Sequence, residues 1–544
     1  MSDQDPELTK PVCIAGVEIP AEHQSDLVLL LVGLIQKQAT EIQQLKDEIQ
    51  RLKGTTRRPN IKPSVLLKDD KKQNNQPPKK RPGSDKRSKT KDIRIDHDVV
   101  LPPTELPPGA VLEGYRDFVV QDLIIKGNNT RYRRAVYRLL DGTLLVGPRP
   151  EGVKSHFGPG LRQYILLQAH QNHVTQNRIL EQLRDLGVDI SAGQISSILL
   201  NGHECFHDEK DQLLPAAREV SDHLHCDDTS ARHQGKSAVC THIGNELFAS
   251  FSTTDSKSRL NFLTLLCQGD DEQYRWCEES LESLRAFGVS KKLMAQMSGE
   301  PDGVWQNRAA WEQQLEKWGL SPKDQTRVSE AALCGKLLTE AWYSRIGLVS
   351  DDAPQFKLFG LIHGLCWVHG ERKIDRLIPL TASHRRAKEQ SQQQFWDLYA
   401  SLKNYRDSPT EQQRIEIGLR FDAMCSQKTG YGELNEALGL LGAKREEFLA
   451  VLEHPELPLH NNLSENDIRE YARLRKISGG TRSDVGRRCR DTFMSLKKTC
   501  RKLGVSFGAY LADRLSEKNQ IPPLVELIRR KAMNDSSESI PSAA

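Results

Sequence analysis

The sequence has no Cys-x-x-Cys pair among its eleven cysteines and no apolar run long enough to cross a bilayer. The longest such run, LVLLLVGLI at residues 27–35, is well short of the ~20 residues that a spanning helix needs. The first ten residues, MSDQDPELTK, are polar and acidic and do not resemble a secretory leader. Free thiols in a reducing compartment, a cytoplasmic location and no membrane partner are therefore expected.

What the chain does contain is enough material for several domains. It has 544 residues, of which 37% are hydrophobic and 28% are charged. A chain of this length exceeds one compact core, so two to four domains are expected. The formal net charge of +4 is small, and the distribution of charge along the chain is more informative than its sum.

A heptad pattern covers residues 24–53. Position a holds Val28, Ile35, Ile42 and Ile49, and position d holds Leu31, Gln38, Leu45 and Leu52. The flanking positions carry opposite charges, with Glu41 and Glu48 at g and Lys46 and Lys53 at e. Branched residues at a with leucine at d favour a parallel two-stranded coiled coil, so this leucine zipper predicts a homodimer or a higher oligomer. The alternative is a single amphipathic helix packed against its own domain.

The composition changes after the zipper. Residues 54–91 are rich in Lys, Arg and Pro and lack apolar periodicity, which predicts a basic flexible linker. A basic arm beside a dimerisation helix is suited to nucleic-acid phosphates, although a solvated spacer has the same composition. Residues 92–160 alternate short strand-like runs with the turn residues GNN and LDG, which predicts a small β-rich module.

Residues 161–216 are expected to be helical. One helix is predicted near 175–186, a break at Gly187, and a second helix with Ser191 as its N-cap. Two short helices joined by a glycine turn fit a helix-turn-helix, in which Gln194 and Ser196 lie near the face offered to DNA. An ordinary helical hairpin fits the same pattern.

An α/β core is predicted over residues 217–480. Its strand candidates are HLHCDDTS, KSAVCTHIG and ELFASFST, followed by the helix SKSRLNFLTLL and by two further strands, GLVSDDA (347–353) and LIHGLCWVH (361–369). Large helical insertions are expected at about 271–345 and 384–452. Basic helices follow over residues 481–533, and residues 534–544 are expected to form a disordered tail.

Carboxylates recur at three separated places in this core. Asp227 and Asp228 follow the strand HLHC, Asp351 and Asp352 follow GLVS, and Glu465 opens a later helix. Parallel strands with like ends would place the two Asp pairs side by side at one edge of a sheet, where open α/β sheets carry their sites.

Three converging carboxylates cannot all stay ionised without a counter-charge. A pair of Mg²⁺ ions meets this need, because Mg²⁺ prefers oxygen ligands and two such ions suit an in-line phosphoryl displacement. The alternative is a structural role, since Asp is common at the ends of strands.

Three blocks of the sequence resemble the transposases of the insertion-sequence-sixty-six family. They are HCDDTSARHQGK, the pair LVSDDAPQF and LCWVHGERK, and NNLSENDIREYARLRKISGGTRSDVGRR. These transposases are DDE enzymes with a ribonuclease-H-like catalytic core. The order of zipper, basic linker, small domain, helix-turn-helix-like segment, core and basic C-terminal helices also fits, and the resemblance covers nearly the whole chain.

The resemblance implies specific roles for individual residues. The catalytic, metal-holding set would be Asp227, Asp351 and Glu465. At the first two positions the neighbouring residue, Asp228 or Asp352, could be the metal ligand instead. His369 of the Cys-Trp-x-His block and Asn462 of the Asn-Asn-x-x-Glu block would be auxiliary. Many family members carry a cysteine-rich zinc segment before the core, but residues 92–160 hold no cysteine, so no zinc is expected there.

Basic residues crowd the segment around and after Glu465. Arg469 lies four residues beyond Glu465 on one helix face, so it could orient that glutamate or contact a phosphate. A phosphate track is the favoured interpretation of the set Arg469, Arg473, Arg475, Lys476, Arg482, Arg487 and Arg488. A solvated helix face is the alternative, and Gly480 could let the backbone approach nucleic acid closely.

The function predicted from these features is a transposase that cleaves DNA at the ends of its element and joins the 3′-hydroxyl to target DNA. Two Mg²⁺ ions are the expected cofactors, with Mn²⁺ as a substitute. The expected partners are DNA, further copies of the chain and small accessory proteins of the same element. The alternatives are a ribonuclease-H-like nuclease without strand transfer and a non-catalytic dimeric DNA-binding regulator.

Overall fold

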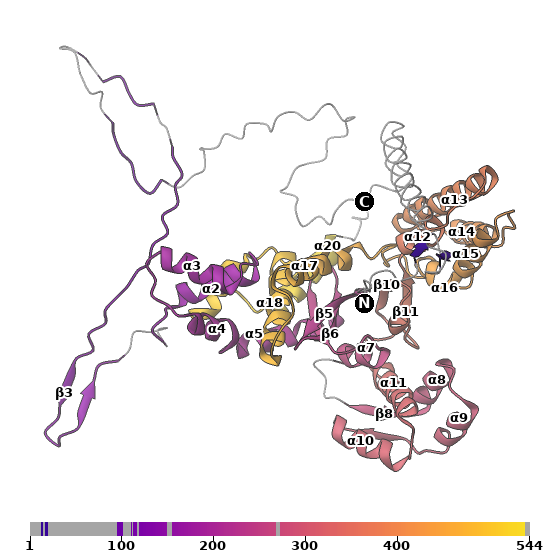
Figure 1. Ribbon diagram of the computed structural model, residues 1–544, viewed down its shortest axis with the longest axis horizontal. Coiled ribbons are helices and arrows are strands. Elements are labelled where there is room, and N and C mark those ends of the chain that lie inside the picture. The colour runs from indigo at the N-terminus through magenta and orange to yellow at the C-terminus, as the bar shows by residue number, and fades with distance from the viewer. Residues whose placement is uncertain are drawn as a thin grey trace, which may run out of the picture. The chain divides into compact units, whose positions relative to one another are not determined.

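The computed structural model describes residues 12–14, 17–19, 95–101, 110, 112–116, 119–148, 155–267 and 273–538. The expected coiled coil at 24–53 and basic linker at 54–91 lie outside these residues. The chain divides into two units (Figure 1). The helical unit comprises residues 1–63 and 367–455, and the sheet unit comprises residues 64–366 and 456–544.

A five-stranded mixed sheet organises the sheet unit, so the chain is a mixed α/β protein as predicted. Its strands are β5 (His223–His233), β6 (Lys236–Gly244), β7 (Ala249–Thr254), β10 (Gly347–Ser350) and β11 (Ile362–Leu365). Their order is β11-β10-β5-β6-β7. Strands β5, β6 and β7 form an antiparallel meander, whereas β10 runs parallel to both β5 and β11. Only β6 therefore runs against the other four strands.

The central strand β10 is buried along its whole length. All four residues of β10, GLVS, are buried, as expected for a parallel strand covered on both faces. The edge strand β7 is covered by α18 (Asp484–Lys502), whose side chains accept hydrogen bonds from backbone N–H groups of the strand. The N–H of Phe251 donates to Ser495 Oγ at 2.9 Å, and the N–H of Thr253 donates to Asp491 Oδ2 at 2.7 Å. An edge satisfied in this way cannot pair with another chain.

Helices pack around this sheet in two sequence blocks. The first block contains α5 (Glu204–Asp211), α6 (Leu213–Val220), α7 (Arg259–Leu266) and the short turn η4 (Pro354–Phe356). The second contains α17 (Asn462–Ser478), α18, α19 (Phe507–Leu515) and α20 (Leu524–Glu538). Helix α20 buries Leu524 and Ile528 completely and extends to Glu538. The tail expected to be disordered from residue 534 is thus helical for its first residues, and residues 539–544 lie outside the described part.

The insertion expected near 271–345 is helical but also contains a small hairpin. It comprises β8 (Tyr274–Trp276), α8 (Glu278–Ala286), α9 (Lys291–Met297), β9 (Gly303–Trp305), α10 (Arg308–Lys317) and α11 (Pro322–Leu338), which Figure 1 shows gathered around β8. Aromatic rings form its centre. Trp311 lies 5.0 Å from Tyr274, 5.0 Å from Trp305 and 5.6 Å from Trp318 between ring centroids.

The helical unit is built around Trp367. Its helices are α12 (Trp367–Asp375), α13 (Ala382–Asp407), α14 (Glu411–Cys425), α15 (Gly432–Gly442) and α16 (Arg445–Phe448), with η5 (Ala450–Leu452); the unit also includes the paired strands β1 (Val12–Ile14) and β2 (Val17–Ile19). Trp367 is fully buried, and its indole N–H donates to the carbonyl of Phe448 at 2.9 Å. The strand predicted over 361–369 is therefore wrong beyond Leu365, because Trp367 starts a helix that packs into this core.

Residues 155–200 form a small three-helix cluster within the sheet unit. The helices are α2 (Pro159–His170), α3 (Gln176–Asp185) and α4 (Ala192–Leu200). Ile179 and Ile195 are fully buried in their shared core. Ser191 accepts a hydrogen bond from the N–H of Gln194 at 3.2 Å, and Gly187 has a φ of +75°. The predicted N-cap and the predicted glycine break are both confirmed.

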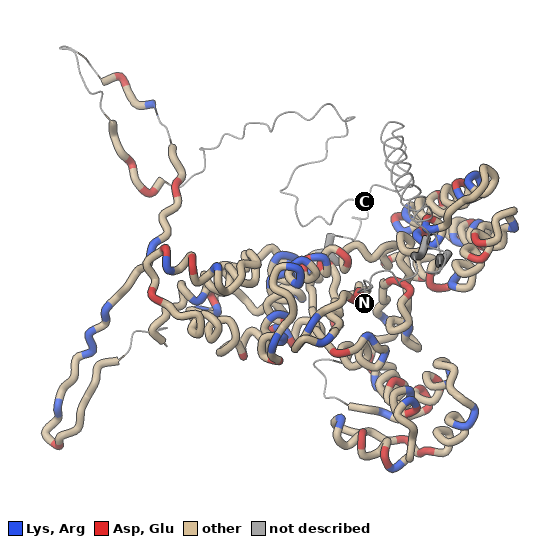
Figure 2. The backbone as a smooth tube through the Cα atoms, viewed as in Figure 1, with Lys and Arg blue, Asp and Glu red and all other residues tan. Residues whose placement is uncertain are grey.

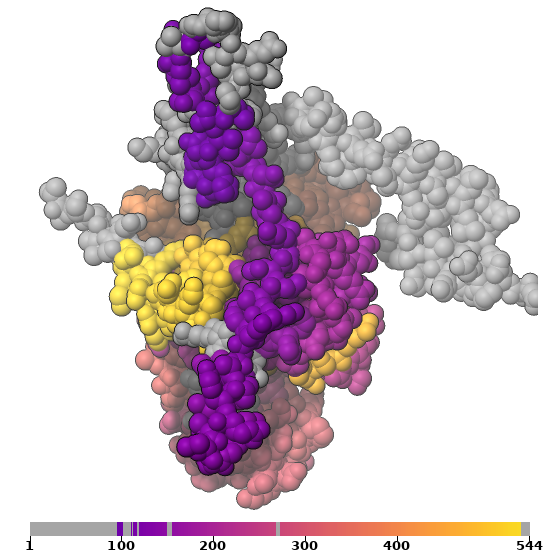
Figure 3. Space-filling view, turned by 90° about the vertical axis from the view of Figure 1, so that its left-hand side faces the viewer, coloured from indigo at the N-terminus to yellow at the C-terminus, as the bar shows by residue number. Residues whose placement is uncertain are grey.

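Of the β-rich module expected at residues 92–160, the described residues contain one hairpin. Strands β3 (Val136–Arg138) and β4 (Leu144–Val146) pair around a turn at Asp141 and Gly142. Nearly all side chains of residues 119–148 are exposed, including Leu123 and Ile124, as the purple segment in Figure 3 shows. Without a buried face, these apolar runs have no packing to hold further strands together.

Candidate active site

Two of the predicted carboxylates belong to neighbouring parallel strands: Asp227 lies within β5, and Asp351 directly follows β10. In the register of β5 and β10, Gly347 pairs with His223 and Val349 pairs with His225. Asp227 and Asp351 each lie two residues beyond the second of these pairs. The two aspartates therefore occupy matching positions along adjacent parallel strands, although β5 continues to His233 beyond Asp227.

Asn461 connects the third carboxylate to the same strand. This residue is fully buried immediately before α17, and its side chain reaches across to β5. The amide nitrogen donates to the carbonyl of Cys226 at 2.6 Å, and the amide oxygen lies 3.0 Å from His225 Nδ1. Because Glu465 is in the first turn of α17, these contacts fix the start of its helix beside the strand that carries Asp227.

The three carboxylates interact electrostatically. Burial raises the pKa of Asp227 to about 7; the N–H of Asp228 opposes this shift, and the charges of Asp351 and Glu465 add to it. An ordinary exposed aspartate has a pKa near 3.9. Burial and the two neighbouring carboxylates thus disfavour the charged form of Asp227, and a cation bound beside it would relieve this cost.

Asp227 and Asp351 accept hydrogen bonds from the backbone N–H groups of Asp228 and Ala353, whereas the second aspartate of each pair contacts neighbouring side chains. Asp228 accepts hydrogen bonds from Thr241 Oγ1 at 2.5 Å and from Gln355 Nε2 at 2.8 Å. Asp352 lies 3.2 Å from Lys357 Nζ. Burial raises the pKa of Asp228, while the hydrogen bonds from Thr241 and Gln355 act to lower it. Both oxygens of Asp228 are thus engaged by neighbouring side chains, which favours Asp227 as the residue facing a cation.

The predicted contact between Glu465 and Arg469 is present. Arg469 Nη2 donates to Glu465 Oε2 at 3.1 Å, and the arginine side chain is 62% exposed. The arginine is therefore placed to hold the glutamate while still presenting charge to solvent. The glutamate side chain is only 13% exposed, so the arginine approaches it from the solvent side.

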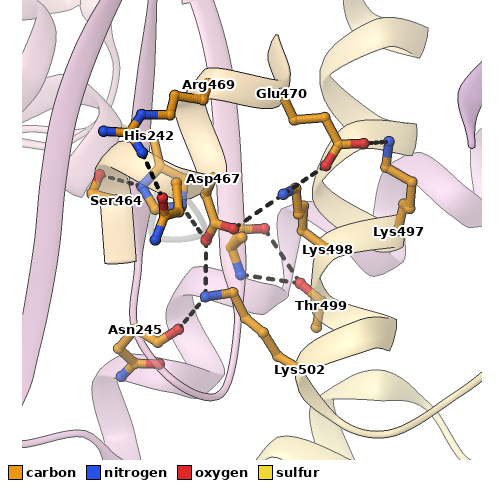
Figure 4. Close-up of polar contacts among 12 residues, drawn as sticks. His242, Asn245, Ser464, Asp467, Arg469, Glu470, Lys497, Lys498, Thr499 and Lys502 are labelled. Carbon is orange, nitrogen blue, oxygen red and sulfur yellow. Dashed lines mark hydrogen bonds and ion pairs between the residues drawn. The ribbon is translucent and has the colours of Figure 1, made fainter. Parts of the chain in front are cut away.

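A buried ionic network holds the face of α17 that lies opposite Glu465, as Figure 4 shows. Asp467 lies 2.9 Å from Lys502 Nζ and 3.3 Å from Lys498 Nζ, both on α18. His242 on β6 lies 3.3 Å from Asp467 and 2.6 Å from Ser464 Oγ. The helix that presents Glu465 is thereby tied to the sheet on one side and to α18 on the other.

The predicted phosphate-binding residues fall into two groups. Arg473, Lys476 and Arg482 are exposed, and Figure 2 shows basic residues gathered around α17 and α18. The remaining arginines after Arg469 have acidic or polar partners in the fold: Arg475 with Ser230, Arg487 with Asp484 and Asp255, and Arg488 with Asp211. The first group is the better placed to meet DNA.

The other predicted site residues belong to α4, α12 and the start of α17. Gln194 is exposed on α4 and Ser196 is half-buried there. His369 belongs to α12 of the helical unit and is in a helix rather than in the strand expected for it. Asn462 begins α17, whereas its neighbour Asn461 makes the contacts to β5.

Gly480 allows a close approach of backbone to backbone within the protein. A Cβ at this position would lie 2.4 Å from the carbonyl oxygen of Arg232. The N–H of Thr481 donates to that same oxygen at 2.9 Å, and Gln234 donates back to Thr481. The glycine is thus required by the contact with β5, and not by an approach to nucleic acid.

The raised pKa of Asp227 leads to a testable prediction about the stability of the folded chain. Since the folded-state pKa of Asp227 lies above its unfolded value, this side chain binds more protons in the folded state between about pH 4 and pH 7, and its contribution to the free energy of unfolding falls as the pH rises through this range. In a chelator and at pH 8, Asp227→Asn is therefore expected to melt a few degrees above the unsubstituted chain. At pH 4 the difference should largely vanish, as thermal scans at both pH values would measure.

Asp222→Asn provides the matched control for that experiment. Asp222 immediately precedes β5, and its side chain is 69% exposed beside Arg345. Its replacement should leave the melting temperature nearly unchanged at both pH values. Equal melting of the Asp227→Asn variant and the unsubstituted chain at pH 8 would show that the acidic cluster is not under electrostatic strain.

The fold and the site together define a mixed α/β protein with an acidic cluster on two adjacent parallel strands. The family model described as "Transposase IS66 family" matches residues 154–243 and 336–488, which include Asp227, Asp351 and Glu465. The chain belongs to the IS66 transposase family, as its sequence suggested, and DNA is the partner that this family implies.

A relative in Sinorhizobium fredii is consistent with this assignment. The chain is 37% identical to the "Uncharacterized protein y4jO" of that organism over 324 residues, covering 59% of this chain and all of the relative. No solved structure matches the chain significantly. Among the helices that the structure describes, none is long and apolar enough to span a membrane.

Sequence reasoning missed two groups of residues that position the site. Asn461 was part of a matched block but was not singled out, although an asparagine just before a helix already predicts a capping or anchoring role. The ionic residues His242, Asp467, Lys498 and Lys502 had no signal in the sequence, because their spacing along the chain reveals no contact.

Proposed function

We propose that this chain is a DNA transposase that uses Asp227, Asp351 and Glu465 to cleave strands at the ends of its element and to join the freed 3′-hydroxyl to target DNA. The observation that carries the proposal is the placement of three carboxylates far apart in the sequence: Asp227 and Asp351 lie on adjacent parallel strands, and Asn461 anchors the helix of Glu465 to the strand of Asp227. The arrangement of five strands, with only β6 antiparallel to the rest, supports a ribonuclease-H-like core.

The residues present fit a pair of divalent cations, Mg²⁺ or its substitute Mn²⁺. All three side chains offer the oxygen ligands that hard cations prefer, and the raised pKa of Asp227 shows that a positive charge there would be stabilised. When bound, two such ions supply an activated water or hydroxyl nucleophile and charge stabilisation for the leaving oxygen.

The chain's own residues would position the reacting DNA. Asn461 holds the start of α17 against β5, so that Glu465 keeps a fixed place beside Asp227. Arg469 orients Glu465 from the solvent side. The exposed residues Arg473, Lys476 and Arg482 would grip phosphates of the bound strand, which places the scissile bond without reading its sequence.

The remaining predicted parts supply recognition and pairing of element ends. Helices α3 and α4 would present Gln194 and Ser196 to a DNA groove as a helix-turn-helix. The predicted coiled coil at 24–53 would bring two chains, and so two ends, together, and the basic linker would add phosphate contacts. His369, Asn462 and accessory proteins of the same element keep the auxiliary roles that the resemblance implies.

Two other functions share many of these features. A ribonuclease-H-like nuclease would use the same carboxylates without strand transfer. A DNA-binding regulator would need only the recognition parts, and the coupled carboxylates would then serve no purpose. Membership of a transposase family favours strand transfer over both.

A joining assay distinguishes the three functions. The full chain is incubated in Mg²⁺ with pre-cleaved element ends, which carry a free 3′-hydroxyl, and with a labelled target duplex. Joined products are expected if the chain is a transposase. Cleavage of intact ends without any joined product would support the nuclease, and specific binding with neither reaction would support the regulator.

A further inference from the structure

We propose that His223, His225 and Glu246 form a second metal site, separate from the acidic cluster, that takes one Zn²⁺ or a similar transition-metal ion. The two histidines lie on β5, and Glu246 lies in the turn between β6 and β7. Their potential ligand atoms all lie within 4.8 Å of one another. Imidazole nitrogen with one carboxylate is a donor set that zinc prefers and that Mg²⁺ does not.

The positions of the two histidines fit a single tetrahedral ion. Residues two apart on a strand share a face, so the His-x-His spacing aims both rings to one side of β5. Their ring centroids are 5.3 Å apart, with an angle of 87° between the ring planes. Two imidazoles bound to one ion at ~2.0–2.1 Å with a tetrahedral angle have centroids about 5.2 Å apart.

The third ligand is also within reach. His223 Nε2 lies 3.2 Å from Glu246 Oε2, close to the ~3.4 Å that separates two ligand atoms on a tetrahedral zinc ion. Asn245 fixes the turn that bears Glu246, because its amide donates to Ser221 Oγ at 2.7 Å and to the carbonyl of His223 at 3.3 Å. The carboxylate side chain itself is 59% exposed, which leaves solvent access for a fourth ligand.

A supporting hydrogen bond orients the buried histidine. His225 is 1% exposed, and its Nδ1 faces the amide oxygen of Asn461 at 3.0 Å. Donation from Nδ1 to a carbonyl oxygen leaves Nε2 as the ligand, and metal-binding histidines usually have such a partner on their second nitrogen. A simple ion pair between His223 and Glu246 does not involve the ring of His225, so it explains neither the placement nor the fixed orientation of that ring.

A bound ion would clamp the beginning of β5 to the turn between β6 and β7. Asn461, which anchors the helix of Glu465, would then rest against a metal-bound ring. The ion would stabilise the sheet at the place where the acidic cluster is assembled. This role is structural, so it holds whether or not the chain transfers DNA strands.

Cobalt substitution tests the proposal on the full chain. Metal-stripped protein carrying Asp351→Asn, which weakens the acidic cluster, is titrated with Co²⁺. The expected result is the intense visible absorption of four-coordinate Co²⁺, saturating at one ion per chain and abolished by Zn²⁺; six-coordinate Co²⁺ on oxygen ligands absorbs only weakly. The affinity for Co²⁺ should fall at least about tenfold in Glu246→Ala and in His223→Ala. Even the loss of a hydrogen bond to a ligand can weaken metal binding about tenfold, and these variants lose the ligand itself.

The controls separate ligand loss from misfolding. Glu246 is largely exposed, so Glu246→Ala should retain the circular dichroism spectrum of the parent even if His223→Ala does not. His97→Ala, which removes an exposed histidine from residues 95–101, should bind Co²⁺ like the parent. Absence of the four-coordinate spectrum, or a spectrum unchanged in Glu246→Ala, would overturn the site without affecting the proposed transposase activity.

Discussion

Asp351→Asn is expected to reduce strand cleavage at an element end by on the order of 10³-fold while DNA binding is retained. The substitution removes one negative charge but keeps the shape of the side chain after β10. Losing a metal-holding carboxylate forfeits several kcal/mol of transition-state stabilisation, which corresponds to a rate effect of this size. Single-turnover cleavage of an end-labelled duplex in Mg²⁺ measures the rate, and a gel-shift titration measures the binding.

Asp352→Asn is the matched control for that substitution. Asp352 is the next residue along the chain, and its carboxylate lies 3.2 Å from Lys357. Cleavage by this variant should stay within a few-fold of the parent rate. If cleavage survives Asp351→Asn and is lost in Asp352→Asn, the metal ligand after β10 is Asp352 and not Asp351. If it survives both, the acidic cluster is not the catalytic site.

The sheet and its two aspartates could be predicted because the signals are local. All four residues of the run GLVS are buried, as in a parallel strand covered on both faces, and HLHC leads into Asp227 within β5. Like sequences at the ends of parallel strands reach the same edge, so the neighbourhood of Asp227 and Asp351 follows from the strand directions. The helix opened by Glu465 was likewise visible from its sequence and resemblance.

What the sequence could not predict depends on contacts between distant residues. Asn461 bonds to Cys226 across 235 positions, and although its place before a helix suggests an anchoring role, no local pattern identifies the strand that it contacts. The covering of β7 by α18 uses Ser495, a residue that looks like an ordinary polar position of an exposed helix. The strand expected through Trp367 failed for a related reason, since an apolar run of that length fits a buried helix equally well.

Lys502→Met is expected to lower the free energy of unfolding of the sheet unit by about 3–5 kcal/mol. The lysine side chain is 1% exposed, and its ammonium lies 2.9 Å from Asp467 and donates to the carbonyl of Asn245 at 2.6 Å. Burial alone would raise the pKa of Asp467, but Lys502, then His242 and Lys498, hold that pKa far below its usual range. Removing Lys502 leaves a carboxylate that is 4% exposed without its nearest cation.

Urea unfolding of the full chain measures this loss, and Arg501→Met is the control. Arg501 precedes Lys502 on α18 but is exposed, so its replacement should change the free energy of unfolding by no more than about 0.5 kcal/mol. Adding Asp467→Asn to Lys502→Met should restore part of the stability, because the uncompensated buried charge is then absent. Since α17 also presents Glu465, the single Lys502→Met variant should cleave DNA more slowly even below its melting temperature. If Lys502→Met is as stable as Arg501→Met, the buried network does not hold the glutamate's helix in place.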